Sequence, residues 1–330
     1  MKIAVIASKT MQKDVIGEKA INRMKAYAEV SLNDDELEIT AENVKKTIKD
    51  ADIAITSWGN TNLEADILDE CPNLKLIVHA AGSVKPIVSD EVWKRGIRVC
   101  ASTKPLGIGV AETSLGLAIS ACKNFYQCND DIHNGGYNDH RENVMELYDI
   151  TVGVISAGWV GRHFIKLMNC FDVDVLLYDP YVTDEQAAEM GCKKAEFKEL
   201  LEKSDIVSIH APSIPATNHM FNEETLGLMK DNAIIINTSR GTLIDENALY
   251  RYMSEGKFKY ACLDVYDPEP LTVENPLRTL KNAILTPHIA GLAGNGKLRI
   301  GKHAAEQIEN FIAGRALECE VKEEMLATMA

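Results

Sequence analysis

The chain has 330 residues, of which 46% are hydrophobic and 25% are charged, and its formal net charge is −14. This composition is typical of a globular protein and excludes a disordered, collagen-like or coiled-coil chain. The negative charge disfavours nucleic acid and anionic membrane surfaces as partners, because both would repel it. At roughly 100 to 200 residues per domain, the length predicts about two domains.

The sequence shows neither a membrane span nor a secretion signal. No uncharged apolar stretch approaches the roughly 18 residues of a span, and the apolar run at 1–7 is too short for the core of a signal peptide. The eight cysteines form no Cys-x-x-Cys pair and no regular disulfide framework, which is typical of a reducing compartment. They also do not cluster with histidines as zinc ligands do. We therefore expect a cytoplasmic protein with no metal site.

Short β-branched apolar runs alternate with helical stretches along most of the chain. This alternation predicts parallel strands joined by crossover helices, and hence an α/β fold with doubly wound parallel sheets. The expected strands, in chain order, are 2–7, 53–56, 76–78, 98–100, 151–155, 174–178, 206–209, 233–237, 260–264 and 283–285.

Two features predict the domain limits. A loop at 102–107 precedes a long helical stretch at 110–126, which would bridge two lobes. The polar segment that follows, at 129–148, is predicted to be a loop that wraps around the protein. A second glycine-rich turn at 290–296 leads into a helical pattern at 297–312, which is expected to return to the first lobe. The sequence therefore predicts a discontinuous first lobe, residues 1–104 plus 291–330, and a second lobe of residues 105–290.

A glycine-containing turn follows the strand at 151–155 and opens a helical stretch, and the next strand ends in Asp179. In the dinucleotide-binding fingerprint, one glycine lets the backbone approach the pyrophosphate, another lets the helix pack on the strand, and an acidic residue about 20 positions on binds the ribose hydroxyls. Gly158, Gly161 and Asp179 fill these roles, although Ser156 replaces the first glycine. The pattern predicts a dinucleotide site, with a plain structural turn as the alternative. Asp179 favours NAD over NADP, because a carboxylate repels the 2′-phosphate.

Three successive strands of the second lobe are followed by ionisable residues, Arg240, Glu269 and His288. Ligands bind outside the carboxyl ends of strands in such sheets. Hydride reduction of a 2-keto acid needs a proton donor, for which histidine is suited, a carboxylate that orients the imidazole, and a cation that binds the substrate carboxylate. We predict these roles for His288, Glu269 and Arg240, with solvated side chains or structural salt bridges as the alternative. His210 follows the strand at 206–209, and we expect it either to line the cofactor site or to be a buried neutral histidine.

Three segments in this order resemble the D-isomer-specific 2-hydroxyacid dehydrogenases. They are NTSRGTLIDE at 237–246, LDVYDPEP at 263–270 and LTPHIAG at 285–291. The resemblance covers essentially the whole chain. It implies a flavodoxin-like substrate lobe, a Rossmann NAD-binding lobe and a cleft between them, with NAD as the cofactor.

The resemblance also implies roles for individual residues. It makes Arg240, Glu269 and His288 the catalytic set, with His288 as the proton donor in keto-acid reduction. Together with the glycine turn, it predicts an NAD site lined by Gly158, Trp159, Val160, Gly161, Asp179, Ala211, Thr238, Ser239, Arg240, Asp264, His288 and Gly291. Backbone amides of a first-lobe loop would bind the substrate carboxylate, which points to Ala81, Gly82 and Ser83 together with Arg240 and His288. A homodimer is implied, with 110–126 and 129–148 as its candidate interface.

The first-lobe loop departs from the family pattern at Lys85, where an aspartate is common. We expect this lysine either to meet a second anionic group on the substrate or to be solvated. Glyoxylate, hydroxypyruvate, pyruvate-like acids and 3-phosphoglycerate remain candidate substrates. The function predicted is an NAD-dependent oxidoreductase that interconverts a small 2-keto acid and a D-2-hydroxy acid by hydride transfer. The alternative is a dinucleotide-sensing interaction protein, like the co-repressors that keep this fold and triad.

Overall fold

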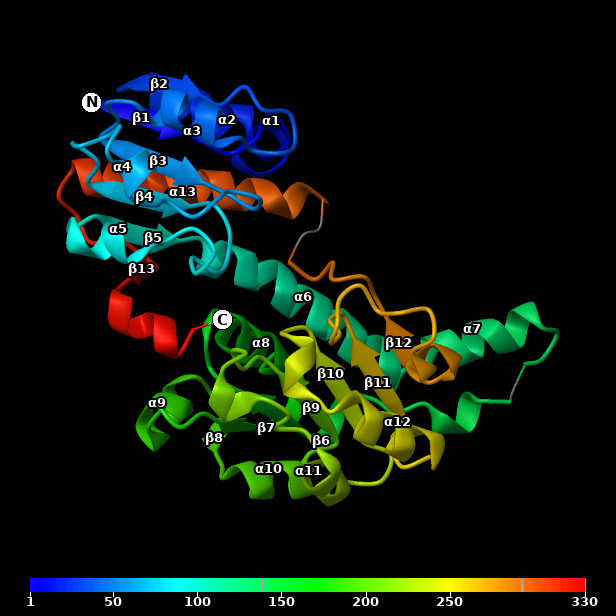
Figure 1. Ribbon diagram of the computed structural model, residues 1–330. Coiled ribbons are helices and arrows are strands. Elements are labelled where there is room, and N and C mark those ends of the chain that lie inside the picture. The colour runs from blue at the N-terminus through cyan, green and yellow to red at the C-terminus, as the bar shows by residue number, and fades with distance from the viewer. Residues whose placement is uncertain (138, 292–293, 330) are drawn as a thin grey trace. The chain divides into compact units, whose positions relative to one another are not determined.

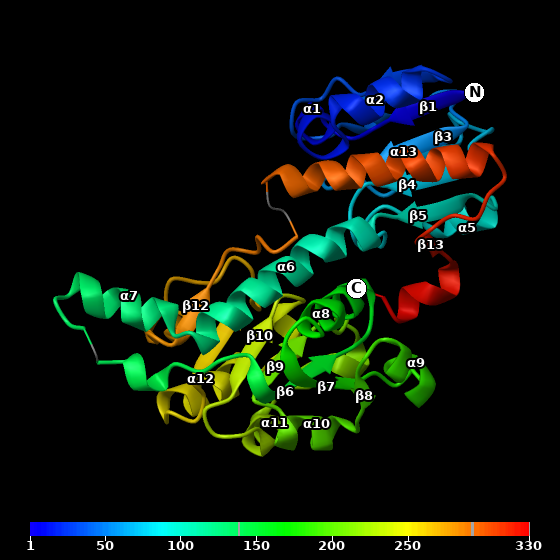
Figure 2. The same cartoon turned by 180° about the vertical axis from the view of Figure 1, so that it is seen from behind.

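The computed structural model describes residues 1–137, 139–291 and 294–329, and the chain divides into two compact units. Unit 1 comprises Met1–Leu106 and Leu292–Ala330, and unit 2 comprises Gly107–Gly291. The limits predicted from the sequence fall after residues 104 and 290. Figures 1 and 2 show the elements of each unit from opposite sides.

The described residues of unit 1 form a six-stranded sheet in the order β13-β5-β4-β3-β1-β2. Its strands are β1 (Lys2–Val5), β2 (Glu29–Leu32), β3 (Ile53–Thr56), β4 (Leu76–His79), β5 (Arg98–Ala101) and β13 (Glu320–Val321). All neighbours are parallel except β13, which pairs antiparallel with β5. The order of the five parallel strands is that of flavodoxin-like sheets.

Helices cover both faces of this sheet, so its central strands are buried on both sides. Ala4 packs on one face with α3 and α4, whereas its neighbours Ile3 and Val5 pack on the other face with α2 and α13. Figure 2 shows α13 lying along this second face. The helices of unit 1 are α1 (Lys9–Met11), the π-helix η1 (Gln12–Ile16), α2 (Glu18–Lys25), α3 (Ala41–Ile48), α4 (Ala65–Leu68), α5 (Asp90–Lys94), α13 (Leu298–Ile312) and the 3-10 turns η6 (Gly294–Lys297) and η7 (Glu323–Ala327).

The described residues of unit 2 form a parallel seven-stranded sheet in the order β12-β11-β10-β9-β6-β7-β8. The strands are β6 (Tyr148–Ile155), β7 (Asp172–Tyr178), β8 (Lys193–Lys194), β9 (Ile206–Ile209), β10 (Ile234–Asn237), β11 (Tyr260–Leu263) and β12 (Ala283–Leu285). The strand order reverses between β6 and β9, which is the Rossmann arrangement and marks the expected ligand position. The predicted fold class, with two doubly wound and mostly parallel sheets, is confirmed.

Helices also cover both faces of the unit 2 sheet. Residues of α10, α11 and α12 pack on one face, and residues of α6 and α8 pack on the other. The helices are α6 (Thr103–Cys122), α7 (Phe125–His133), α8 (Trp159–Met168), α9 (Asp184–Glu189), α10 (Phe197–Lys203), α11 (Glu223–Leu228), α12 (Glu246–Ser254) and the 3-10 turns η2 (Arg141–Asn143), η3 (Pro215–Thr217), η4 (Gly241–Leu243) and η5 (Pro276–Thr279).

The predicted strands are all present, but β2, β8 and β13 were not expected. Each lies at or near a sheet edge and is short or partly exposed, so it lacks the continuous apolar run that identifies a buried strand. The predicted helix at 297–312 matches α13, which belongs to unit 1 as expected. The glycine-rich turn at 290–296 lies partly outside the described residues.

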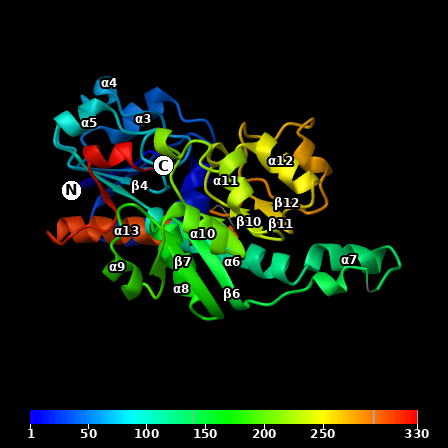
Figure 3. The same cartoon turned by 90° about the horizontal axis from the view of Figure 1, so that it is seen from below.

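Two predictions around α6 are wrong. The expected loop at 102–107 is helical, because α6 begins at Thr103. Pro105 is tolerated there, since amides in the first helical turn have no acceptor within the helix. The expected helix 110–126 is interrupted, because Asn124 adopts a left-handed φ of 54° between α6 and α7. The first part of the expected wrapping loop therefore belongs to α7, which projects from the rest of unit 2 (Figure 3).

Among the described residues, α6 alone is long and apolar enough to cross a membrane by length and composition. It carries Lys104 and Glu112, and Ala111, Leu117 and Ala118 are buried in the unit 2 core. Core packing accounts for its apolar composition. All eight cysteines are free thiols, and no group of three or more potential metal ligands is present among the described residues.

Gly301 tests the packing of α13 on unit 1. A Cβ atom at this position would collide with the backbone carbonyl of Ile16, whereas a Cβ at the exposed Gly116 of α6 would meet open space. Gly301→Ala should lower the free energy of unfolding by about 2 kcal/mol. Gly116→Ala, its control, should raise it by about 0.5 kcal/mol through helix propensity. Urea unfolding of both variants checks this, and equal stabilities would contradict the packing.

Candidate active site

The glycine turn between β6 and α8 has the shape that a dinucleotide needs. A Cβ at Gly158 would meet nothing within 4 Å, so the N-terminal end of α8 is open to an anionic group. A Cβ at Gly161 would collide with the carbonyl of Ser156, so only glycine lets α8 pack this closely on the turn. The roles predicted for these two glycines, backbone approach and close packing, match this geometry.

Ser156 occupies the place of the missing first glycine and adopts its conformation, with φ at +76°. This left-handed region costs a residue with a side chain roughly 1–2 kcal/mol. The side chain does find a partner, because Ser156 Oγ donates to Asp179 Oδ2 at 3.3 Å. The turn thus forms with a serine in place of glycine.

Asp179 is buried after the end of β7, and its carboxylate accepts hydrogen bonds from the backbone of the turn. Its Oδ2 accepts the amide of Ala157 at 2.8 Å, and its Oδ1 accepts the amide of Tyr181 at 2.8 Å. Asp179 therefore has a structural task in this turn, and its predicted contact with the ribose stays a prediction. Oδ2 already accepts two hydrogen bonds, but Oδ1 accepts only one and can accept a second, so the residue still fits a ribose.

The structure brings Arg240, Glu269 and His288 together on three adjacent strands. Glu269 Oε2 lies 2.8 Å from His288 Nδ1, and Glu269 Oε1 accepts the amide of Tyr266 at 3.1 Å. Burial lowers the pKa of Arg240, and the charge of the nearby Glu269 opposes that shift. A guanidinium stays protonated even so. The site thus holds a permanent cation beside a carboxylate and an imidazole.

Gly241 explains how Arg240 comes close to this pair. A Cβ at Gly241 would collide with the backbone of Tyr266 and Asp267. The loop that follows β10 is therefore packed directly on the loop that follows β11 and carries Glu269. Arg240 Nη1 also donates to the carbonyl of Ser239 at 2.6 Å, which fixes its direction.

Asp264 has a structural task that the sequence did not reveal. It is fully buried, and its Oδ1 accepts Thr286 Oγ1 at 2.5 Å and the amide of Ile289 at 2.9 Å. Its Oδ2 accepts the amide of Ala290 at 2.8 Å, and its carbonyl accepts the amide of His288 at 2.8 Å. Asp264 therefore holds the loop that presents His288. Its predicted place in the NAD site stays a prediction.

The remaining predicted cofactor residues lie at the same carboxyl edge of the unit 2 sheet. Ala211, Thr238 and Gly291 follow the ends of β9, β10 and β12, and Trp159 and Val160 open α8 after β6. The sequence reasoning missed Ser114 of α6, whose Oγ lies 3.0 Å from the buried Thr238 Oγ1. Glu112 and Thr113 of the same helix are polar as well, so no local pattern singled out Ser114.

His210 is a buried neutral histidine. Its Nε2 lies 3.0 Å from Ser208 Oγ, its ring contacts Phe164, and burial lowers its pKa to about 3. Its Nδ1 is buried without a partner among the described residues. An unsatisfied polar atom at this edge is a position that a bound dinucleotide could complete, so the residues present fit this cofactor.

The first-lobe loop predicted to bind substrate follows β4 in unit 1. Ala81 is buried, and Gly82 and Ser83 are partly exposed. Lys85 Nζ donates to the carbonyl of Met329 at 2.6 Å. This loop lies in unit 1 whereas Arg240 and His288 lie in unit 2, so their joint action on one substrate stays a prediction.

The comparisons with known proteins agree with this site. Residues 115–290 match the family model described as D-isomer specific 2-hydroxyacid dehydrogenase, NAD binding domain. The chain belongs to the D-isomer specific 2-hydroxyacid dehydrogenase family. The predicted family and the predicted nicotinamide dinucleotide cofactor are thereby confirmed, whereas the residues predicted to bind the cofactor stay a prediction.

Curated relatives differ in length and in name. A D-3-phosphoglycerate dehydrogenase of Methanocaldococcus jannaschii is 35% identical over 94% of this chain and 58% of its own length. A glyoxylate reductase of Korarchaeum cryptofilum is 30% identical over 91% of this chain and 91% of its own. The chain spans about half the length of the phosphoglycerate dehydrogenases it matches. These relatives are named dehydrogenases and reductases, and they lend no support to the alternative of a dinucleotide-sensing interaction protein.

Two solved structures share the whole fold. The PH0520 protein of Pyrococcus horikoshii has a TM-score of 0.79 at 27% identity, and the match covers 98% of this chain and 96% of that one. An acyclic imino acid reductase in complex with NADPH and D-Arg has a TM-score of 0.78 at 25% identity, and the match covers 98% and 100%.

Buried histidines predict how stability depends on pH. Burial lowers the pKa of His79 from 6.5 to about 4. Between these values the unfolded chain binds a proton that the folded protein does not, so the free energy of unfolding falls as pH drops from 6.5 to 4. His79 accounts for about 3 kcal/mol of this loss. His79→Gln, which does not titrate, should flatten the profile in urea unfolding, while His210 keeps its own share. An unchanged profile would contradict a neutral His79.

Proposed function

We propose that this protein is an NAD-dependent oxidoreductase that interconverts a small 2-keto acid and a D-2-hydroxy acid by hydride transfer. The pair formed by His288 and Glu269, with Nδ1 and Oε2 2.8 Å apart, is the observation that carries the proposal. It stands at the same edge of the sheet as the glycine turn of the dinucleotide site. Family membership and the reductase and dehydrogenase names of the relatives support it.

The chemistry follows from the side chains at this edge. A bound nicotinamide dinucleotide supplies or accepts the hydride. His288, whose Nδ1 is held by Glu269, donates a proton from Nε2 to the carbonyl oxygen during reduction and takes it back during oxidation. The carboxylate of Glu269 stabilises the imidazolium and fixes the orientation of the ring. Arg240 binds the substrate carboxylate and polarises the keto oxygen.

Asp179 supports NAD as the preferred dinucleotide. Its carboxylate stands at the end of β7, where the adenine ribose is bound in this fold, and it would repel a 2′-phosphate. In unit 1, amides of Ala81, Gly82 and Ser83 at the end of β4 would bind the substrate carboxylate. The names of the relatives cover phosphoglycerate, glyoxylate and hydroxypyruvate, which supports a small 2-hydroxy acid as the substrate class. We also place the protein in the cytoplasm, which its free cysteines support.

His288 tests the proposed reaction. NADH and NADPH oxidation by the purified protein should be followed with glyoxylate, hydroxypyruvate and pyruvate. His288→Ala should lower kcat by about 10²- to 10⁴-fold, because the proton donor is lost, and Glu269→Gln should also lower it. His219→Ala, which changes a histidine outside the set, should leave kcat close to that of the original protein. Full activity of His288→Ala would refute the role of the imidazole.

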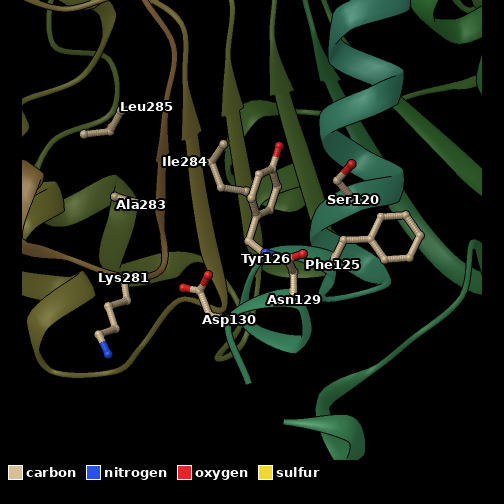
Figure 4. Close-up of a pocket in the computed structure, with 9 residues that line it drawn as sticks. All are labelled: Ser120, Phe125, Tyr126, Asn129, Asp130, Lys281, Ala283, Ile284 and Leu285. Carbon is tan, nitrogen blue, oxygen red and sulfur yellow. The ribbon is translucent and has the colours of Figure 1, made fainter. Parts of the chain in front are cut away.

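We further propose a homodimer built on α6, α7 and the segment that follows α7. Large apolar side chains are exposed there, among them Phe125 at 55%, Ile132 at 56% and Tyr148 at 66%. Exposed apolar surface of this extent is typical of an interface. A hollow of about 830 Å³ lies between the end of α6, α7 and β12. Figure 4 shows Phe125, Tyr126 and Ile284 around it.

Glutamate substitutions at exposed apolar residues test the proposed dimer interface. Phe125→Glu combined with Ile132→Glu should convert a dimer into a monomer, because each carboxylate would be buried without a partner. Sedimentation equilibrium measures the mass. Leu37→Glu is the control, because it changes a still more exposed apolar residue of unit 1, and it should leave the dimer intact. A wild-type monomer, or a double variant that remains dimeric, would contradict this interface.

A further inference from the structure

A second glutamate contacts the loop that carries Glu269, and the proposed chemistry assigns it no role. Glu246 is the first residue of α12 and lies six residues after Arg240. Its Oε1 accepts the amide of Asp267 at 2.9 Å, and its Oε2 accepts Asn275 Nδ2 at 2.7 Å. Asp267 stands two residues before Glu269, and Asn275 stands six residues after it. One carboxylate therefore holds this loop on both sides of Glu269.

The loop has little core packing of its own, so its hydrogen bonds matter. Residues 267–270 are all exposed, and an exposed segment with few buried contacts is held weakly by packing. Arg278 holds the part that follows, because its guanidinium donates to the carbonyl of Leu271 at 2.7 Å and to the carbonyl of Thr272 at 2.8 Å. The hydrogen bonds of Glu246 restrict the part that burial does not.

Glu246 also connects this loop to the segment that carries Arg240. A Cβ at Gly241 would collide with the backbone at the amide of Asp267, so the loops that follow β10 and β11 already meet at that point. Glu246 adds a second contact between the same two loops through its side chain. Charge-assisted hydrogen bonds of this kind are strong and directional. The segments of Arg240 and Glu269 are therefore linked by a backbone contact and by a carboxylate.

The place of Glu269 decides whether its carboxylate reaches the imidazole. Glu269 Oε2 lies 2.8 Å from His288 Nδ1, and a separation of about 3.6 Å no longer makes a hydrogen bond. The backbone of His288 is held separately, because its amide donates to the carbonyl of Asp264 at 2.8 Å. A loop movement of about 1 Å would therefore separate the two groups while the histidine stays in place.

We propose that Glu246 is a positioning residue, which holds the loop after β11 so that the carboxylate of Glu269 meets His288. Without the side chain of Glu246, the amide of Asp267 and the amide group of Asn275 lose this acceptor, and the exposed loop can move away from the imidazole. Glu246 thus acts on the reaction through Glu269. This inference rests on the proposed function and adds a supporting residue to its site.

Steady-state kinetics with NADH and glyoxylate or hydroxypyruvate test this role. Glu246→Ala should lower kcat by about tenfold, because a small displacement of a catalytic group has a large effect on rate. The KM for the keto acid and the Kd for NADH should stay close to those of the original protein. Glu246→Gln should lose less, because its amide oxygen still accepts the amide of Asp267 although its NH₂ group cannot accept from Asn275.

A double-mutant cycle shows whether Glu246 acts through Glu269. In the Glu269→Ala protein, Glu246→Ala should lower kcat no further, because the contact that it supports is already lost. A residue with a purely structural role would lower kcat by the same factor in both backgrounds. Glu246→Gln takes the place of Glu246→Ala in the cycle if the alanine variant does not fold.

Asp245 provides the matched control at the same end of α12. Its Oδ1 accepts the amides of Asn247 and Ala248 at 3.0 and 3.2 Å, which caps the helix. Asp245→Ala should therefore lower the midpoint of urea unfolding and leave kcat close to that of the original protein. An equal loss of kcat in Asp245→Ala and Glu246→Ala would overturn the inference, because loosening of α12 would then explain both.

The outcomes distinguish this inference from the function on which it rests. Full kcat in a folded Glu246→Ala protein, with kcat lost in His288→Ala, would overturn the inference and leave the proposed function standing. So would an equal loss of kcat from Glu246→Ala with and without the Glu269 side chain. Absence of turnover with every keto acid and both cofactors would overturn the proposed function and the inference together.

Discussion

The site depends most on the buried carboxylate of Asp264. A fully buried acidic side chain is stable only when its oxygens are satisfied, and here three donors from the loop after β12 converge on it. Charge-assisted bonds of this kind are short and directional. They tie the loop to the end of β11, and His288, with a left-handed φ of 52°, is held within it. The distance between His288 and Glu269 follows from this anchor.

Close backbone packing supplies the second constraint. Gly161 and Gly241 each stand where any side chain would collide with a neighbouring backbone. One brings α8 against the dinucleotide turn, and the other brings the loop of Arg240 against the loop of Glu269. Because parallel strands end at one edge, such loops meet although their residues are far apart in the chain. Arg240 is thus brought near Glu269 by a backbone contact between their two loops.

A lysine of unit 1 already has a partner within the fold. Lys85 is suited by type to hold an anion, yet its amine is bound to the carbonyl of Met329. A residue's chemistry therefore indicates what it can bind, whereas its partners in the fold decide what it is free to bind.

The sequence by itself determined the fold class and the candidate triad. Buried parallel strands are continuous apolar runs and therefore stand out, and Arg240, Glu269 and His288 each follow such a run, so their convergence could be predicted from topology alone. Short edge strands such as β13 were not predicted because they bury little apolar surface. The start of α6 was predicted wrongly because Pro105 indicates a loop but is tolerated in a first helical turn. Only the tertiary structure decided the task of Asp264, the neutrality of His210 and the engagement of Lys85. These depend on hydrogen-bond partners and burial contributed by residues distant in the chain, which no local pattern encodes.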